Sequence, residues 1–335
     1  MTKLRCRGAG LAIVALLLGA CATQRFVDVR SANQDDRVRF LVLHFTDENF
    51  ERSLDLLTRP HDNPVSAHYL VSRAGEGGHA APTVYRLVDE SQRAWHAGPS
   101  RWQGHEPLNG ESVGVEIVYE SHCPRDRSPS AAKAMDGRER PREPARPARA
   151  SPWDVDATCA YPEWPADQID AVIALARGIV ARHPEIEATR VVGHSDVQPE
   201  NKTDPGPRFP WRRLAEAGIG AWYDEADVAW YRGEFARGAN GARGDGAVVL
   251  PLKTVQQALA AYGYGVPPSG VDDLRTHEVL SAFQSHFLPQ RRSGEADAET
   301  LATLFALLAR YRGDELRALR EHAPEIPPSP PPRPR

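Results

Sequence analysis

The sequence predicts an α/β domain followed by a small all-helical domain. Between about residues 37 and 220, apolar runs of strand length alternate with amphipathic segments of helical spacing, a pattern typical of α/β folds. A Gly-rich stretch from 233 to 246 interrupts this pattern and has the composition of a linker. Three apolar stripes with helical spacing follow it. The chain of 335 residues exceeds the usual size of one hydrophobic core, so two domains are expected.

Residues 1–21 predict a lipoprotein signal peptide. Three basic residues precede the apolar run 11–18, which is too short to span a bilayer, and this order is typical of a secretory signal. The segment Leu18-Gly19-Ala20-Cys21 resembles the lipobox of bacterial lipoproteins, which implies that Cys21 is lipidated. An ordinary signal peptide with an incidental cysteine is the alternative. Position 22 is not Asp, and by resemblance to enterobacterial lipoproteins this implies an outer-membrane anchor facing the periplasm.

The α/β domain is predicted to span residues 37–220, after a polar tether at 22–36. The apolar run Arg39–Phe45 predicts a strand buried on both faces. Thr46-Asp47 offers an N-cap for a helix that ends near Leu57. The other elements predicted in this domain are strands at Ala67–Ser72, Thr83–Asp89, Ser112–Tyr119 and Thr189–Gly193, and a helix at Ala166–His183 that Pro184 ends.

An insert interrupts this domain at about residues 124–150. It is rich in Arg, Pro, Ala and Glu and has almost no large apolar side chains, so we expect it to be disordered. Cys123 and Cys159 flank it. In an oxidising periplasm these two cysteines predict one disulfide, with two free thiols as the alternative.

The C-terminal part is divided by composition. Residues 221–248 are predicted to be a linker, 249–312 the helical domain, and 324–335 a Pro-rich disordered tail.

The apolar fraction of 41% indicates a globular protein. The formal net charge is −4, and no basic block marks a recognition helix, so nucleic acid is not an expected partner. The oligomeric state stays open.

Three residues have the chemistry of a metal site. His44 ends a predicted buried strand, His194 follows another, and Asp204 comes ten residues later in a loop that contains Pro205 and Pro207. Two imidazoles and one carboxylate, with a fourth position left to water, are a ligand set of catalytic zinc. Residue types alone leave a second interpretation open, because a histidine at a strand end is often structural.

The sequence around these residues resembles the type-2 N-acetylmuramoyl-L-alanine amidases. The resembling segments occur in the family's order: Val42-Leu43-His44-Phe45-Thr46, Ser66-x-His68-Tyr69-Leu70-Val71, Ala94-Trp95-His96-Ala97-Gly98, Asn109-x-x-Ser112-Val113-Gly114-Val115-Glu116, Gly193-His194-Ser195-Asp196, Lys202-x-Asp204-Pro205-Gly206-Pro207 and Phe209-Pro210-Trp211. The outer-membrane lipoprotein branch of the family, whose members also carry a C-terminal helical domain, is the most similar. The resemblance implies a mixed central sheet flanked by helices, as in peptidoglycan-recognition proteins.

The resemblance also implies the chemistry. His44, His194 and Asp204 would hold one Zn²⁺ per chain, Glu116 would be the general base, and Lys202 would stabilise the oxyanion. The substrate would be peptidoglycan or a muropeptide, cut between the lactyl group of (anhydro-)N-acetylmuramic acid and L-alanine.

The strand pattern and the resemblance also give expectations for further residues. Strand alternation places Glu116 on the other face of the strand from Val115 and Ile117. A carboxylate on that face points either to solvent or into a site. Trp95 and His96 are expected at the substrate groove, whereas His68 is either there or in the core. Ser195 and Asp196 are interpreted as orienting the zinc loop, since no nucleophile elbow surrounds them.

The helical domain resembles the type-1 peptidoglycan-binding domain. The resembling residues are Val255-Gln256-Gln257-x-Leu259, Tyr262-Gly263-Tyr264, Phe283-Gln284 and Asp297-x-Glu299-Thr300-Leu301. A helical cap that only packs on the enzyme is the alternative. For the whole chain two other hypotheses stay open, namely a non-catalytic wall receptor on the same fold and a zinc peptidase that cuts the stem peptide.

Overall fold

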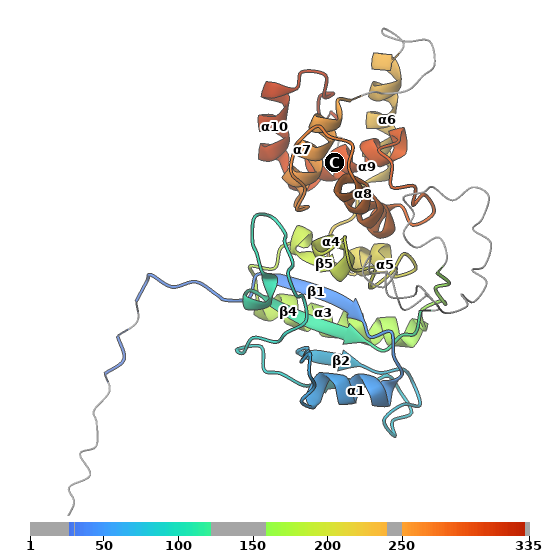
Figure 1. Ribbon diagram of the computed structural model, residues 1–335. Coiled ribbons are helices and arrows are strands. Elements are labelled where there is room, and N and C mark those ends of the chain that lie inside the picture. Colours follow the sequence, from blue (N-terminus) through green and yellow to red (C-terminus); the bar gives the residue numbers. More distant parts are fainter. Residues whose placement is uncertain (1–26, 30, 122–158, 240–249, 332–335) are drawn as a thin grey trace, which may run out of the picture. The chain divides into compact units, whose positions relative to one another are not determined.

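The computed structural model describes residues 27–29, 31–121, 159–239 and 250–331 (Figure 1). All helices and strands named below lie in the compact unit formed by residues 36–335. The predicted signal peptide, Cys21, Cys123 and the insert at 124–150 lie outside the described residues. Cys159 is disulfide-bonded.

The α/β part is built on a five-stranded mixed sheet in the order β3-β2-β4-β1-β5, which confirms the predicted fold class. The strands are β1 (Phe40–Phe45), β2 (Tyr69–Val71), β3 (Val84–Arg86), β4 (Ser112–Ile117) and β5 (Val191–Gly193). Strand β3 is antiparallel to β2, and the other neighbours are parallel. The predicted strand at 189–193 begins only at Val191, because Ala188–Arg190 form a 3₁₀ turn.

The two faces of the sheet have different roles. Leu41 and Leu43 of β1 point to the face covered by α3 (Ala166–Arg182), where they pack with Val172 and Ile179. The alternate residues of β1 point to the opposite face, because side chains alternate along a strand. His44 is one of these residues, so the site lies on the face that α3 does not cover.

Helix α1 (Phe50–Thr58) begins later than the sequence indicated. Asn49 is its N-cap, since its side chain accepts a hydrogen bond from the Arg52 N–H at 2.9 Å. The predicted cap at Thr46-Asp47 was wrong. The Asp47 carboxylate instead accepts hydrogen bonds from the backbone N–H and the hydroxyl of Ser121.

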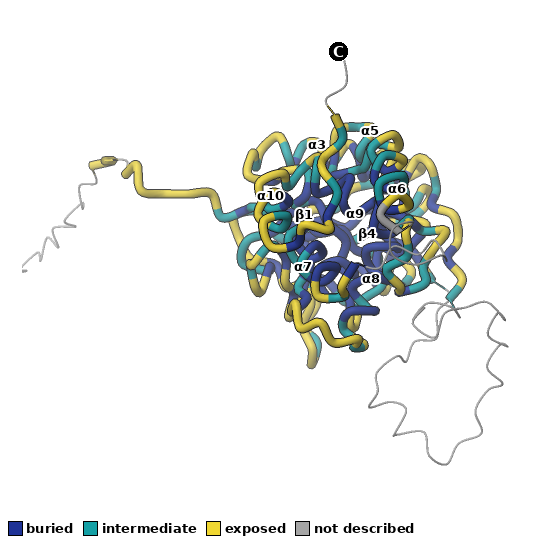
Figure 2. The backbone as a smooth tube through the Cα atoms, turned by 90° about the horizontal axis from the view of Figure 1, so that it is seen from above, coloured by how far each residue is buried: buried dark blue, intermediate teal, exposed yellow. Residues whose placement is uncertain are grey.

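The C-terminal part contains five helices among the described residues. They are α6 (Glu225–Ala239), α7 (Leu252–Tyr262), α8 (Leu274–Phe287), α9 (Ala298–Tyr311) and α10 (Gly313–His322). The three predicted apolar stripes correspond to α7, α8 and α9, whereas α6 and α10 extend this part beyond the predicted bounds of 249–312. Figure 2 shows buried tube segments where α8 and α9 lie, and also at β1 and β4.

The predicted linker at 221–248 was wrong over much of its length, because it contains α6. Val228, Tyr231 and Phe235 are spaced by three and four residues and are all buried. The rings of Tyr231 and Phe235 lie 5.9 and 5.5 Å from the ring of Phe305 in α9. The Gly-rich composition of this segment indicated a linker, although its buried apolar residues have helical spacing.

The expected disordered tail was also wrong for its first residues. Ile326 is buried, and its N–H donates to the carbonyl of Ala323 at 3.0 Å. The Glu325 carboxylate accepts a hydrogen bond from the hydroxyl of Thr254 in α7. Among the described residues, no helix combines the length and apolarity needed to cross a membrane.

The packing of α6 predicts a large effect of a core substitution. Phe235→Ala should lower the free energy of unfolding by about 3–5 kcal/mol, because it removes a buried ring from the contact with α9. Arg237→Ala, on the exposed side of the same helix, is the control and should change it by less than about 0.5 kcal/mol. Urea unfolding followed by circular dichroism measures both, and equal stabilities of the two variants would indicate a linker after all.

Candidate metal centre

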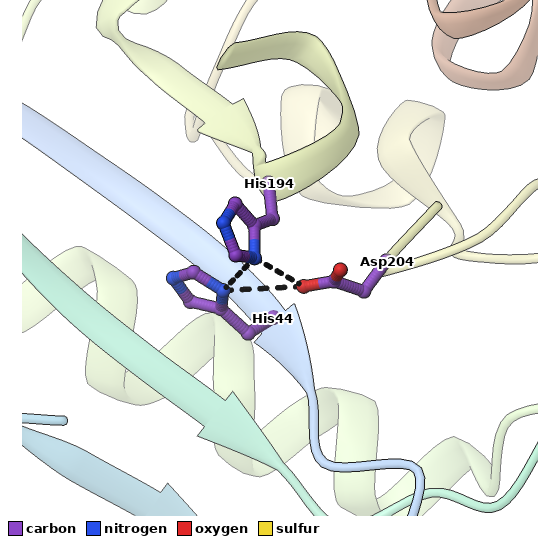
Figure 3. A group of neighbouring side chains, drawn as sticks. All are labelled: His44, His194 and Asp204. Carbon is purple, nitrogen blue, oxygen red and sulfur yellow. Dashed lines mark hydrogen bonds and ion pairs between the residues drawn. The ribbon is translucent and has the colours of Figure 1, made fainter. Parts of the chain in front are cut away.

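Three polar side chains meet at one edge of the sheet. His44 lies near the carboxyl end of β1, and His194 comes directly after the parallel neighbour β5, as the first residue of α4 (His194–Val197). Asp204 lies in the loop that follows α4. Because parallel strands end at the same edge, both imidazoles reach the same point. Figure 3 shows the three side chains directed at one another.

The donor atoms of this cluster are close together and buried. His44 Nδ1 lies 3.0 Å from His194 Nδ1, and each of these nitrogens lies 3.1 Å from Asp204 Oδ2. The three residues are 1%, 4% and 8% exposed. Atoms that share one zinc ion through bonds of about 2.0–2.2 Å lie within about 4.4 Å of each other. The two imidazoles and the carboxylate therefore fit a single zinc ion.

Burial and charge set the protonation of these groups. Burial, with a smaller contribution from His194, lowers the pKa of His44 to about 4, so its imidazole is neutral at neutral pH. Burial alone would raise the pKa of Asp204, but the nearby His194 and His44 outweigh it and hold that pKa below its usual range. A neutral imidazole and an ionised carboxylate are the forms that bind metal.

His96 lies behind His44. His44 Nε2 is 3.0 Å from His96 Nδ1, and His96 Nε2 is 3.1 Å from the Ser112 hydroxyl. That hydroxyl donates to the carbonyl of Leu108 at 2.7 Å. If His44 Nδ1 offers its lone pair to a metal, its Nε2 must carry the hydrogen and donate to His96. His96 Nε2 then donates to Ser112, so the chain of bonds assigns one tautomer to each ring.

The structure thus gives His96 a different place from the expected one at the substrate groove. It is 7% exposed, and its ring occupies the space above Gly114, where an added Cβ would lie 2.4 Å from the ring. The backbone N–H groups of His96 and Ala97 donate to the Asn109 side chain. In the motif that leads to Glu116, Asn109 and Ser112 had no expected role of their own, and the structure shows that both contact His96.

Glu116 lies beside the cluster on the neighbouring strand. In the parallel pairing of β1 and β4 it is the partner of His44. Its Oε2 is buried and has no hydrogen-bond partner among the described residues. Burial, followed by the charge of Asp204, raises the pKa of Glu116 well above its usual value, and Lys202 acts in the opposite direction. Glu116 therefore lies on the same face of the sheet as His44, beside the site.

His68 and Trp95, the two other expected residues, differ in burial. His68 is fully buried, accepts a hydrogen bond from the Gly114 N–H at 2.9 Å and lies 3.2 Å from the carbonyl of Gln92. These bonds make it a core residue that joins β2 to β4. Trp95 is 48% exposed, so its indole is accessible from solvent.

The loop that carries His194 and Asp204 is held by its own backbone and by Asp196. The Ser195 N–H donates to the carbonyl of Asp204 at 2.8 Å, and the Gly193 N–H donates to the Asp196 carboxylate at 2.8 Å. Asp196 also accepts from Tyr264 and His286 of the helical part. These two partners were not predicted from the sequence. They lie 68 and 90 residues after Asp196, and no local pattern connects them with it.

Comparison with known proteins places this geometry in a family. The model of the N-acetylmuramoyl-L-alanine amidase family matches residues 34–207, and a model of peptidoglycan binding domains matches residues 251–304. The chain is 36% identical to the N-acetylmuramoyl-L-alanine amidase AmiD of Escherichia coli K12 over 316 residues, which cover 91% of this chain and 98% of that relative.

Solved structures agree with the sequence comparison. AmpDh3 from Pseudomonas aeruginosa superposes with a TM-score of 0.68 at 34% identity, over 86% of this chain and all of that one. AmiD from E. coli, in complex with its substrate, superposes with a TM-score of 0.63 at 34% identity, over 84% of this chain and 93% of that one. Both the sequence match and the shared fold lead to the same conclusion: this chain belongs to the N-acetylmuramoyl-L-alanine amidase family.

Proposed function

We propose that this protein is a zinc-dependent amidase that hydrolyses the amide between the lactyl group of N-acetylmuramic acid, or its anhydro form, and L-alanine of the stem peptide. The observation that carries this proposal is the convergence of His44, His194 and Asp204 beside Glu116, in a chain of this family. A wall receptor that only binds would not need a carboxylate next to a metal site with one oxygen buried and without a hydrogen-bond partner among the described residues.

The substrate class follows from the relatives. The AmiD structure contains anhydro-N-acetylmuramic acid-L-Ala-D-γ-Glu-L-Lys as substrate, and an AmpDh3 structure contains an anhydromuramic pentapeptide. This chain covers almost all of both proteins. We therefore assign it a muropeptide or peptidoglycan substrate of the same chemistry.

His44, His194 and Asp204 would hold one zinc ion. When bound, zinc acts as a Lewis acid and makes hydroxide available at neutral pH. His96 keeps His44 in the ligating tautomer, and the backbone bond from Ser195 to Asp204 keeps the other two ligands in one loop. The protein thus contributes two imidazoles, one carboxylate and their orientation.

Glu116 is the proposed general base. It accepts the proton of the attacking water at a carboxylate oxygen and returns it to the leaving amine. Its buried Oε2, free of other hydrogen bonds among the described residues, is available for that transfer. Burial raises the pKa of Glu116 above its usual value, which makes its carboxylate a stronger proton acceptor than an exposed one.

Lys202 is the proposed oxyanion partner. Its positive charge acts on both Glu116 and His44, which places it within electrostatic reach of the site. A cation at this position would stabilise the charge that develops on the carbonyl oxygen of the substrate. Trp95, which is half exposed, offers a flat apolar surface for the sugar or the peptide.

We further propose that a lipid on Cys21 anchors the enzyme to the outer membrane, with the catalytic domain facing the periplasm. The proposal rests on the lipobox-like segment Leu18–Cys21 and on the polar residues 22–36 after it. Such an anchor would keep the hydrolase close to an insoluble polymer.

The product identifies the reaction. Digestion of anhydro-muropeptides should release an intact stem peptide that begins with L-alanine, as detected by mass spectrometry. Glu116→Gln should keep zinc but lower kcat by about 10²–10⁴, because the proton acceptor is lost while the ligands remain.

Asp204→Ala is the matched control, since it should lose zinc and activity together. Release of zinc by Glu116→Gln would make Glu116 a ligand. Cleavage within the stem peptide would show a peptidase and refute the proposed function.

His96→Ala should weaken zinc binding by about 10–100-fold, because His44 loses the partner that fixes its tautomer. His96→Asn should restore part of the affinity, since its side-chain oxygen can replace Nδ1 as acceptor. A chelator competition assay measures both. Wild-type affinity in His96→Ala would show that the ring only fills space.

Cys21→Ser should abolish the membrane association of the full-length protein without changing its activity in detergent extracts, because the lipid is attached at that sulfur. Fractionation of the cell envelope and metabolic labelling with a radioactive fatty acid measure this. A labelled Cys21→Ser protein would contradict the anchor.

A further inference from the structure

The Tyr262-Gly263-Tyr264 motif of the helical part lies against the α/β domain. The indole of Trp102 is 1% exposed, and its ring lies 6.1 Å from the ring of Tyr262 and 4.7 Å from that of Tyr264. The Gln103 N–H donates to the carbonyl of Gly263 at 2.8 Å. A Cβ at Gly263 would lie 2.6 Å from the Trp102 ring, so only glycine permits this approach.

The same motif contacts the zinc loop through Asp196. The Tyr264 hydroxyl donates to Asp196 Oδ1 at 2.7 Å, and His286 Nδ1 in α8 donates to Asp196 Oδ2 at 2.8 Å. Asp196 is 1% exposed, so its charge needs these donors. Burial, and next the charge of Asp196, raise the pKa of Tyr264 well above its usual value, so the hydroxyl keeps the proton it donates.

The orientation of His194 depends on this loop. His44 has a partner on the far side of its ring, but His194 Nε2 is buried and has none among the described residues. Apart from its Nδ1 contacts with His44 and Asp204, the His194 ring has no hydrogen-bond partner among the described residues, so the backbone that carries it contributes to its orientation. The Gly193 N–H, one residue before it, donates to Asp196 Oδ2, the oxygen that His286 also contacts.

A second contact holds the helical part to this region. The ring of His286 stacks on Trp211, with centroids 3.9 Å apart and planes 13° apart. Trp211 begins α5 (Trp211–Glu216), which follows the loop of Asp204. Arg275 of α8 also pairs with Glu200, within that loop. The helical part thus contacts the zinc loop at Asp196 and Glu200, between the ligands His194 and Asp204, and also at Trp211, after them.

We propose that the helical part supports the zinc loop, with Tyr264 and His286 acting through Asp196 as positioning residues for His194. This proposal rests on the zinc site of the proposed function. The Tyr262-Gly263-Tyr264 motif, which resembles a peptidoglycan-binding sequence, serves as an internal docking surface in this chain. The amidase domain therefore depends on its helical part for a well-ordered metal site.

The test is a pair of variants in the full-length protein. Tyr264→Phe and Tyr264→Phe/His286→Phe keep the aromatic rings but remove one or both of the donors that the helical part offers to Asp196. In metal-free protein, amide hydrogen exchange of residues 193–198 should become about tenfold faster or more in the double variant. Zinc affinity in a chelator competition assay should fall by about tenfold.

Tyr231→Phe is the matched control. It removes a hydroxyl that accepts a hydrogen bond from Arg320 inside the helical part, away from Asp196. This variant should keep the exchange rates of residues 193–198 and the zinc affinity of wild type, even if its melting temperature falls as far as that of Tyr264→Phe.

Wild-type exchange and zinc affinity in the double variant would overturn the proposal, whether or not retention on peptidoglycan changes. Equal loss in Tyr231→Phe would also overturn it, because the effect would then be general destabilisation. If wild-type protein binds no zinc, the proposed function fails, whereas the exchange comparison in metal-free protein still tests the support of the loop.

Discussion

The structure depends on one electrostatic constraint, which is the burial of two imidazoles and a carboxylate with their donor atoms 3.0–3.1 Å apart. Lone pairs that face each other in a buried site are stable only if a proton or a cation lies between them. The surrounding architecture serves this arrangement. Parallel strands bring His44 and His194 to one edge, Gly114 leaves room for the ring behind His44, and Asp196 anchors the loop that holds the other two ligands.

Much of this site could be predicted from the sequence. The buried strand before His44, the strand before His194 and the spacing to Asp204 are local patterns, and the order of the resembling segments fixed their family. The mixed sheet followed from that resemblance and was confirmed. The side to which Glu116 points could be stated only as an alternative, because alternation along a strand does not say which face carries the site. The pairing of Glu116 with His44 in the sheet decides it.

The predictions that were wrong or incomplete concern contacts between distant segments. The glycines around α6 suggested a linker, but the stripe of Val228, Tyr231 and Phe235 packs on α9, and tertiary packing outweighs the low helix propensity of glycine. Asp47 does not cap the helix, because its carboxylate accepts a hydrogen bond from the Ser121 N–H. His96 was expected to meet substrate, yet it lies behind a ligand. The partners of Asp196 come from the distant helical part, and no local pattern could reveal them.

The central claim is that His44, His194 and Asp204 share one zinc ion, and X-ray absorption at the zinc edge tests it most directly. For purified wild-type protein the account predicts one zinc per chain with two imidazole nitrogens at about 2.0–2.1 Å and oxygen ligands at about 2.0–2.2 Å. The His44→Ala protein should lose this environment. A zinc environment without two imidazoles in wild type, or an unchanged spectrum in His44→Ala, would contradict the account.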